Sequence, residues 1–258
     1  MENDDFPTGY VLNRRDLLGL LGTAGLLAWA RPARALPLLA APLTTCIVRP
    51  ALTEGPYFVD EGLNRSDIRS DPGDNSVRPG TPLELTFNVG ALVSGVCVPL
   101  VGARVDIWHC DHLGVYSDAT DPGFNTVGKK FLRGYQVTDE SGPARFSTIY
   151  PGWYPGRTVH IHFKIRSAPA TAPGYAFTSQ LFFDDALTDQ AYTVAPYAGR
   201  GARAVRNGGD GIYNQAGSQL LLSLTGTTSG YAAAFDVALA GVTPARPGTW
   251  SRIKGRRS

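Results

Sequence analysis

Residues 82–90 read PLELTFNVG, and apolar and polar side chains alternate through the whole segment. Successive side chains of an extended chain point to opposite faces, so every second residue, from Leu83 to Val89, falls on one side. This alternation is typical of a strand with one face in a hydrophobic core and the other toward solvent.

Similar short segments follow along the chain and predict an all-β fold. The further expected strands are residues 103–110, 131–138, 143–149, 158–167, 179–183, 219–224 and 231–239. The tetrapeptide DESG at 139–142 predicts a hairpin turn, and residues 185–192 predict the one short helix. We therefore expect a single-domain β-sandwich with little helix and three long functional loops, at residues 66–80, 117–130 and 195–217.

Composition limits the classes of partner. The 258 residues suit one hydrophobic core, and the 30 glycines and 19 prolines are spread without a period, as in a chain with many turns. Lysine and arginine number 24 against 22 acidic residues, which gives a net charge of +2. A charge this small argues against nucleic acid as a partner.

The first 35 residues resemble an export signal. Arg14 and Arg15 precede an apolar run at 17–30, which is shorter than the roughly 20 residues that span a bilayer. Small residues at 33 and 35 follow at the spacing of a cleavage site. We predict a twin-arginine-type signal peptide at 1–35, no membrane span after its removal, and a domain at 36–258 that is periplasmic or extracellular. An ordinary amphipathic first helix is the alternative.

Export would place three cysteines in an oxidising compartment. Cys46 and Cys97 lie in loop-like segments and are expected to form a disulfide, with three unpaired thiols as the alternative. Cys110 lies in a strand-like segment, which favours a buried thiol.

Two of the four histidines lie in the segment TVHIHFKIRS at 158–167. His160 and His162 share one face of the expected strand, about 6.5 Å apart along it, which is close enough to bind one ion. A polar outer face that happens to hold two histidines is the alternative. A cupin would need a glutamate after the histidines and a zinc hydrolase a third His or carboxylate in register, and the rest of this strand has neither. Tyrosine remains as an oxygen donor, and two phenolates with two imidazoles suit Fe(III) better than Zn(II) or Cu(I).

The segments around these histidines resemble a known family. PGWYP at 151–155, followed by RTVHIHF at 157–163, resembles the iron-site signature of the intradiol ring-cleavage dioxygenases, to which protocatechuate 3,4-dioxygenase and catechol 1,2-dioxygenase belong. TEGPYF at 53–58, GARVDIWHC at 102–110, GVYS at 114–117 and TSQLFF at 178–183 match in family order, and the likeness extends from about residue 46 to 242. The predicted signal peptide indicates the secreted bacterial branch.

The resemblance implies a function and a set of site residues. One non-haem Fe(III) per chain would be held by Tyr116, Tyr154, His160 and His162, and Tyr154 would leave the iron when substrate arrives. Arg157 would stabilise negative charge on the bound ring, with Gln180 beside it. The enzyme would open a small aromatic diol between its hydroxyls with O2, giving a cis,cis-muconate-type dicarboxylate. The resemblance also makes a homo-oligomer worth testing.

Three further points stay open at the level of sequence. Tyr57 and Trp153 either line the substrate pocket or are packed aromatic residues. Strand alternation alone would turn Arg157 away from the histidines, so the turn at 155–156 must bring it back. His109 and Cys110 fall on opposite faces, which favours a structural role for His109.

Two other functions compete with the enzyme. A secreted, non-catalytic β-sandwich module could bind iron or catechols in the same place. A copper or zinc site in the same pocket is the third interpretation.

Overall fold

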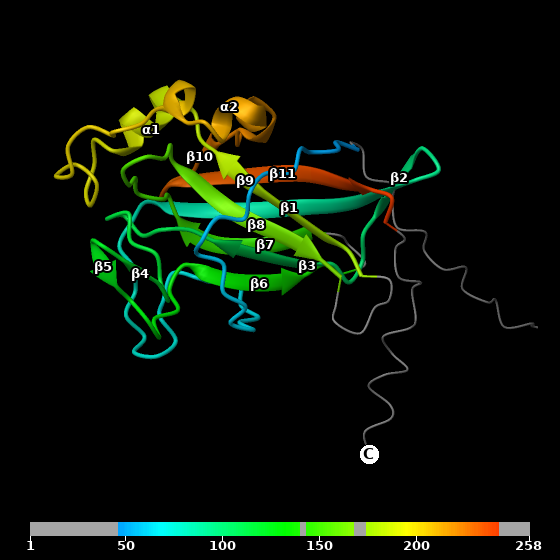
Figure 1. Ribbon diagram of the computed structural model, residues 1–258, viewed down its shortest axis with the longest axis horizontal. Coiled ribbons are helices and arrows are strands. Elements are labelled where there is room, and N and C mark those ends of the chain that lie inside the picture. Colours follow the sequence, from blue (N-terminus) through cyan, green and yellow to red (C-terminus); the bar gives the residue numbers. More distant parts are fainter. Residues whose placement is uncertain (1–45, 140–142, 168–173, 243–258) are drawn as a thin grey trace, which may run out of the picture. The chain divides into compact units, whose positions relative to one another are not determined.

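Two β-sheets form the framework of the residues that the computed structural model describes, 46–139, 143–167 and 174–242 (Figure 1). The predicted leader at 1–35 lies outside these residues. The five-stranded sheet has the order β10-β11-β1-β2, with β7 also paired to β1, and the four-stranded sheet has the order β6-β3-β8-β9. The strands of the first sheet are β1 (Pro82–Val93), β2 (Val96–Pro99), β7 (Pro143–Ile149), β10 (Thr225–Gly226) and β11 (Tyr231–Ala240). The second sheet contains β3 (Arg104–Trp108), β6 (Arg133–Val137), β8 (His160–Arg166) and β9 (Ala176–Phe182).

β1 is the strand around which the first sheet is organised. It pairs antiparallel with β2 and with β7, and parallel with β11 from Leu83↔Tyr231 to Leu92↔Ala240. Its apolar residues Leu83, Leu85, Phe87 and Val89 are all 1% exposed or less. The alternation in the sequence therefore marks the face that packs against the other sheet.

The core lies between the two sheets. Phe87 of β1 and Phe235 of β11 meet Phe163 of β8, with ring centroids 5.2 and 5.6 Å apart, respectively. Aromatic contacts of this kind, made from opposite sheets, are those expected inside a β-sandwich. The predicted all-β sandwich is confirmed.

Two local predictions were wrong. No hairpin joins β6 to β7, because β6 pairs with β3 in one sheet and β7 with β1 in the other. Residues 219–224 form no named strand: the short 3-10 helix η2 (Gly217–Leu220) is followed by a single bridge from Leu221 to Phe182. Leu220 and Leu222 are buried, so their alternation reflects packing against the core and not membership of a sheet.

The long segments hold the remaining elements. Residues 117–130 contain the two-residue strands β4 (Thr120–Asp121) and β5 (Phe124–Asn125). Residues 195–217 contain the 3-10 helix η1 (Asn207–Gly209) and α2 (Tyr213–Ala216). The predicted helix is α1 (Asp185–Ala191), and the carboxylate of Asp184 caps it by accepting the Leu187 amide at 2.9 Å.

Cys46 and Cys97 form a disulfide, with their Cα atoms 5.4 Å apart. It joins the start of the described chain to β2, close to the bridge between Val48 and Ala238 of β11. Cys110 is a buried free thiol, as its strand-like context predicted. Within the described residues, no helix has both the length and the hydropathy of a membrane span.

Candidate metal centre and adjoining cleft

The polar face of β8 is buried at one end, where His160 and His162 are 2% and 1% exposed. Their Nε2 atoms lie 3.0 Å apart. Val159, Ile161 and Phe163 occupy the opposite face and belong to the core, as the alternation predicted. The strand thus holds two imidazoles side by side on a rigid support.

Each imidazole is fixed by a different contact. His160 Nδ1 lies 2.7 Å from the carbonyl oxygen of Thr158, so Nδ1 carries the proton and Nε2 presents a lone pair. The ring of His162 stacks on Trp108 of β3, with centroids 5.1 Å apart and planes at 8°. Trp108 is opposite His162 in the strand register, which explains the stack.

Two phenols complete the group of polar atoms. The hydroxyl oxygens of Tyr116 and Tyr154 lie 3.4 and 3.2 Å from His160 Nε2. Tyr116 is 1% exposed and stacks on Tyr57, whereas Tyr154 is only partly buried. The structure therefore brings together the four residues that the sequence predicted as ligands.

Burial keeps all four groups uncharged in the absence of a cation. It lowers the pKa of His160 to about 3 and that of His162 well below 6.5, with nearby cationic and imidazole groups adding to the effect. Burial also raises the pKa values of Tyr116 and Tyr154 well above 10. Neutral imidazoles are the form that binds metals, and a bound cation would favour the phenolate form of each tyrosine.

The donor atoms fit a hard trivalent ion. Two imidazole nitrogens that bind one ion at roughly 2.1 Å and at a right angle lie roughly 3 Å apart, as these two do. The remaining nitrogen of His162, Nδ1, is buried without a hydrogen-bond partner, so a proton can reside there without disturbing any contact. Two phenol oxygens beside two imidazoles suit Fe(III). No group of three His, Cys, Asp or Glu residues in the described chain offers a second arrangement of this kind.

Arg157 reaches the same place from the turn before β8. Its Nη1 lies 3.5 Å from His160 Nε2, its Nε donates to Asp210 at 2.8 Å, and its Nη2 donates to Gln180 at 2.6 Å. Strand alternation does not apply to Arg157, because Gly156 takes a φ of +87° and β8 begins only at His160. The turn at 155–156 therefore directs the Arg157 guanidinium toward the histidines, as expected.

Asp210 is a site residue that the sequence did not indicate. Burial alone would raise its pKa, but hydrogen bonds from the amides of Tyr213 and Thr158 and from Arg157 outweigh burial and lower it. The carboxylate therefore stays ionised and holds Arg157 in place. It lies in the 195–217 loop, and the length of that loop was the only signal for it.

A strap formed by residues 52–58 covers the polar face of β8 and β9 (blue in Figure 1). Gln180 donates to the Thr53 carbonyl at 2.8 Å, and Glu54 pairs with Lys164 at 2.6 Å. Gly55 has a φ of +74°, and a Cβ atom there would lie 3.0 Å from Cε1 of His162. The strap buries the histidines, and it explains why they do not lie on a solvent-exposed face.

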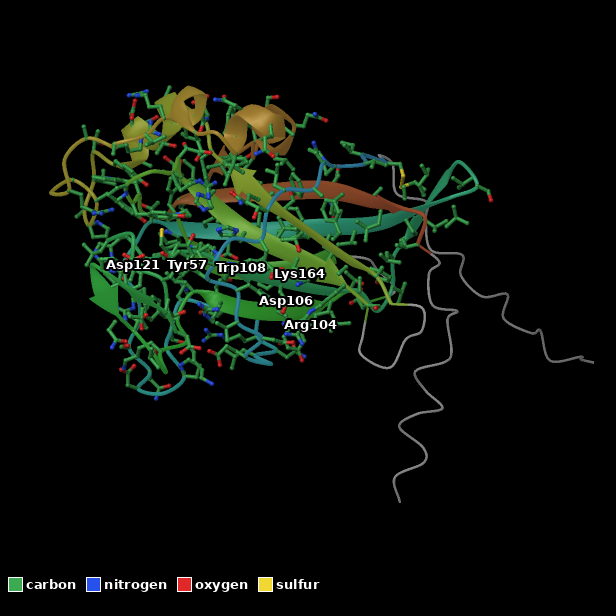
Figure 2. The ribbon with its side chains drawn as sticks, in the orientation of Figure 1. Tyr57, Arg104, Asp106, Trp108, Asp121 and Lys164 are labelled. Carbon is green, nitrogen blue, oxygen red and sulfur yellow. A yellow bond between two sulfur atoms is a disulfide. The ribbon has the colours of Figure 1, made fainter. Side chains whose placement is uncertain are left out.

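A cleft of about 490 Å³ is lined by two of the four predicted ligands, Tyr116 and Tyr154. Tyr57 and Phe124 also line it, so four aromatic rings contribute to its walls. Tyr57 donates to Asp121 at 2.7 Å, and Figure 2 shows this pair at the end of the molecule near β4 and β5. Tyr57 therefore lines this cleft, and its contact with a substrate stays a prediction.

Trp153 does not line the cleft. Its ring is partly buried against the core and lies under the guanidinium of Arg200, 4.6 Å from the ring centroid. His109 has a structural role, since its two ring nitrogens contact the Cys110 carbonyl and Thr148 at 2.8 and 2.7 Å. Neither residue is among those that line the cleft.

Comparison with known proteins points to dioxygenases throughout. The family model described as Dioxygenase matches residues 53–239. Catechol 1,2-dioxygenase 2 of Acinetobacter lwoffii is 30% identical over 161 residues, which cover 52% of this chain and 51% of that protein. The chain thus spans about half the length of the curated relatives it matches.

Solved structures match over a larger share. The intradiol ring-cleavage dioxygenase from Tetranychus urticae has a TM-score of 0.66 and 30% identity, over 78% of this chain and 98% of that one. The dioxygenase domain of a dioxygenase–carbohydrate-binding protein fusion from Streptomyces sp. SirexAA-E has a TM-score of 0.53 and 29% identity, over 76% and 100%.

Proposed function

Because this chain belongs to the intradiol ring-cleavage dioxygenase family, we propose that it is a non-haem Fe(III) enzyme that opens a catechol-type ring between its two hydroxyls. Both atoms of O2 enter the product, a cis,cis-muconate-type dicarboxylate, so the reaction needs no further oxidant or reductant. Fe(III), when bound, supplies a Lewis acid that favours the deprotonated diol.

The observation that supports this proposal is the meeting of four donor atoms in one buried place. The hydroxyls of Tyr116 and Tyr154 and the Nε2 of His162 all lie within 3.4 Å of His160 Nε2. We assign these four residues as the iron ligands. The family supplies the reaction type, and the donor set supplies the reason why iron suits this chain.

The surrounding residues hold Tyr116 more firmly than Tyr154. Tyr116 is fully buried and held against Tyr57, with ring centroids 4.3 Å apart. Tyr154 lies in a turn beside Gly156 and lines the cleft. Tyr154 is therefore the ligand that leaves when the diol enters. Its raised pKa makes the released phenolate a strong base, so its Oη takes one of the two diol protons.

Arg157 supplies a fixed positive charge beside the bound ring. Asp210 and Gln180 hold the guanidinium from two sides, so it need not reorganise when negative charge develops on the ring. Gln180 is in turn held by the strap through the Thr53 carbonyl. Gln180 is a positioning residue for Arg157 in this scheme.

The visible spectrum of the purified protein tests the proposal. We expect a red-brown tyrosinate-to-iron band that shifts when catechol is added without O2, and formation of a dicarboxylate once O2 is admitted. Replacing Tyr154 by Phe should weaken the band and the shift together. A colourless protein with stoichiometric iron, or with copper or zinc, would exclude the enzyme, and a shift without ring opening would favour a binding module.

We also propose that residues 1–35 are a twin-arginine-type signal and that the domain at 36–258 works in the periplasm or outside the cell. The disulfide between Cys46 and Cys97 supports an oxidising compartment. Amino-terminal sequencing of the protein recovered from the periplasm or medium should begin near residue 36. Recovery of the uncut chain from the cytoplasm alone would contradict this.

A further inference from the structure

Arg200 is the only basic residue among the described residues that line the cleft. It comes from the long loop 195–217 and shares the cleft with Tyr116 and Tyr154. A ring bound by its two hydroxyls near these tyrosines would direct its remaining substituents into the same cavity. The charge of Arg200 therefore bears on which substituents the cavity accepts.

The guanidinium is held in one orientation. Its Nη1 donates to the carbonyl oxygens of His112 and Trp153, at 3.0 and 2.8 Å. The guanidinium also lies over the Trp153 ring in a cation–π contact. These contacts occupy Nη1 alone. The other N–H groups, on Nε and Nη2, form the edge that suits a planar, two-oxygen acceptor.

Arg200 also has no carboxylate within ion-pair distance among the described residues, unlike Arg157 beside Asp210 or Arg203 beside Asp185. The cleft contains one acid, Asp121, which accepts a hydrogen bond from Tyr57 at 2.7 Å. The carboxylate of Asp121 is thus already paired, whereas the described contacts of the Arg200 guanidinium are two backbone carbonyls and the Trp153 ring. A partly buried cation with this surrounding attracts an anion.

We propose that the substrate is a catechol that carries a carboxylate on its ring, and that Arg200 binds this carboxylate through Nε and Nη2. This inference rests on the proposed function, because it assumes that the diol end of the ring meets Tyr116 and Tyr154. Arg200 is then the residue that makes the enzyme prefer catechols with a carboxylate over neutral catechols.

The test compares two arginine variants on two substrates. Arg200→Met removes the charge. Arg49→Met is a matched control, because Arg49 also donates to two backbone carbonyls and lies 4.6 Å over an aromatic ring but does not line the cleft. Protocatechuate supplies the carboxylate, and 4-methylcatechol is the neutral analogue. We expect Arg200→Met to lower kcat/KM for protocatechuate by about 10- to 100-fold and for 4-methylcatechol by less than about threefold, and Arg49→Met to leave their ratio unchanged.

Two results would overturn the inference. An equal loss on both substrates would mean that Arg200 only joins the backbone segments at His112 and Trp153. A wild-type preference for 4-methylcatechol would show that the cleft does not select a carboxylate, and a preference for the cationic catechol dopamine would assign the charged end of the cleft to Asp121 instead.

An oxygen-free titration separates this inference from the proposed function. Arg200→Met should weaken protocatechuate binding, followed by tryptophan fluorescence, by about 10-fold or more, while 4-methylcatechol binding stays the same. Selective weakening without any ring opening would sustain the carboxylate site and reject the enzyme. Ring opening by the wild type, with no selective loss of protocatechuate binding in Arg200→Met, would sustain the enzyme and reject the carboxylate site.

Discussion

Gly55 determines how closely the strap can approach His162. The residue has a φ of +74°, and its missing side chain leaves room for the imidazole edge. A left-handed backbone conformation is readily available to glycine and is strained for other residues. Both features make this position sensitive to a single added carbon.

Gly55→Ala should therefore reduce the amount of iron bound. The new Cβ would lie 3.0 Å from Cε1 of His162 and push the ring away from His160. Iron content and the intensity of the tyrosinate band measure the effect. Gly62→Ala is the control, since Gly62 has a φ of +64° with no atom near its Cβ position. Equal iron loss in both variants would show that backbone strain alone is responsible.

Asp210 links the site to acid stability. The pKa of its carboxyl is lower in the folded protein than the ordinary 3.8, as hydrogen bonds to its charged form outweigh burial. The unfolded chain therefore binds this proton at higher pH than the folded one. The resulting stability is present above about pH 4 and is lost as pH falls through the lower, folded pKa.

Asp210→Asn should remove this part of the pH dependence. Denaturant unfolding between pH 2.5 and 7 should give the variant a flatter decline in free energy below pH 4 than the wild type shows. The variant should also have a lower kcat, because Arg157 loses its ionic partner. Parallel pH curves for the two proteins would contradict the assignment of the charged form to Asp210.

At the level of elements, the β8 strand shows how far sequence reasoning reaches. Alternation correctly assigned Ile161 and Phe163 to the core and both histidines to the other face, because neighbours along a strand are fixed by local geometry. Alternation could not show that this face is buried. The strap that buries it lies about a hundred residues earlier in the chain, and only tertiary packing brings it there.

Other errors have the same origin. The tetrapeptide at 139–142 has hairpin-like residues, but β6 and β7 belong to different sheets, a choice that depends on their partners β3 and β1. Asp210 and Arg200 are unremarkable residues in a loop without a motif. The four proposed ligands could be singled out because they lie in short, dense motifs, whereas the groups that hold Arg157 and line the cleft come from distant segments.

Phe58 should control how often the strap opens. Its ring lies 4.9 Å from that of Trp108, and the ammonium of Lys164 lies 4.4 Å from its centroid. Losing these contacts in Phe58→Ala should cost about 1–2 kcal/mol locally and speed exchange of the Leu52 amide, which bonds the Thr178 carbonyl, by roughly tenfold. Hydrogen exchange by mass spectrometry measures this. Val59→Ala, at an exposed neighbour, should leave the rate unchanged.

At the scale of the whole molecule, the disulfide between Cys46 and Cys97 closes a large loop. The two cysteines are 51 residues apart in sequence, and the intervening chain includes the strap and all of β1. A cross-link of this length restricts the unfolded chain by about 4 kcal/mol in the chain-entropy account.

Reduction should therefore lower the free energy of unfolding by about 4 kcal/mol. Denaturant unfolding with and without a thiol reductant measures the difference. A Cys46→Ser, Cys97→Ser double variant should match the reduced wild type and should not respond to reductant. A response in the double variant would point to Cys110 as the thiol involved.

The parallel pairing of β1 with β11 determines when this domain can fold during synthesis. β1 begins at Pro82, and the strand that completes its ladder ends at Ala240. A ribosome that has made only the first sheet's early strands holds a chain in which β1 has an open edge and an uncovered apolar face. The first sheet is therefore complete only after Ala240 has left the ribosome, so the proposed metal site, which depends on the closed sandwich, forms late in synthesis.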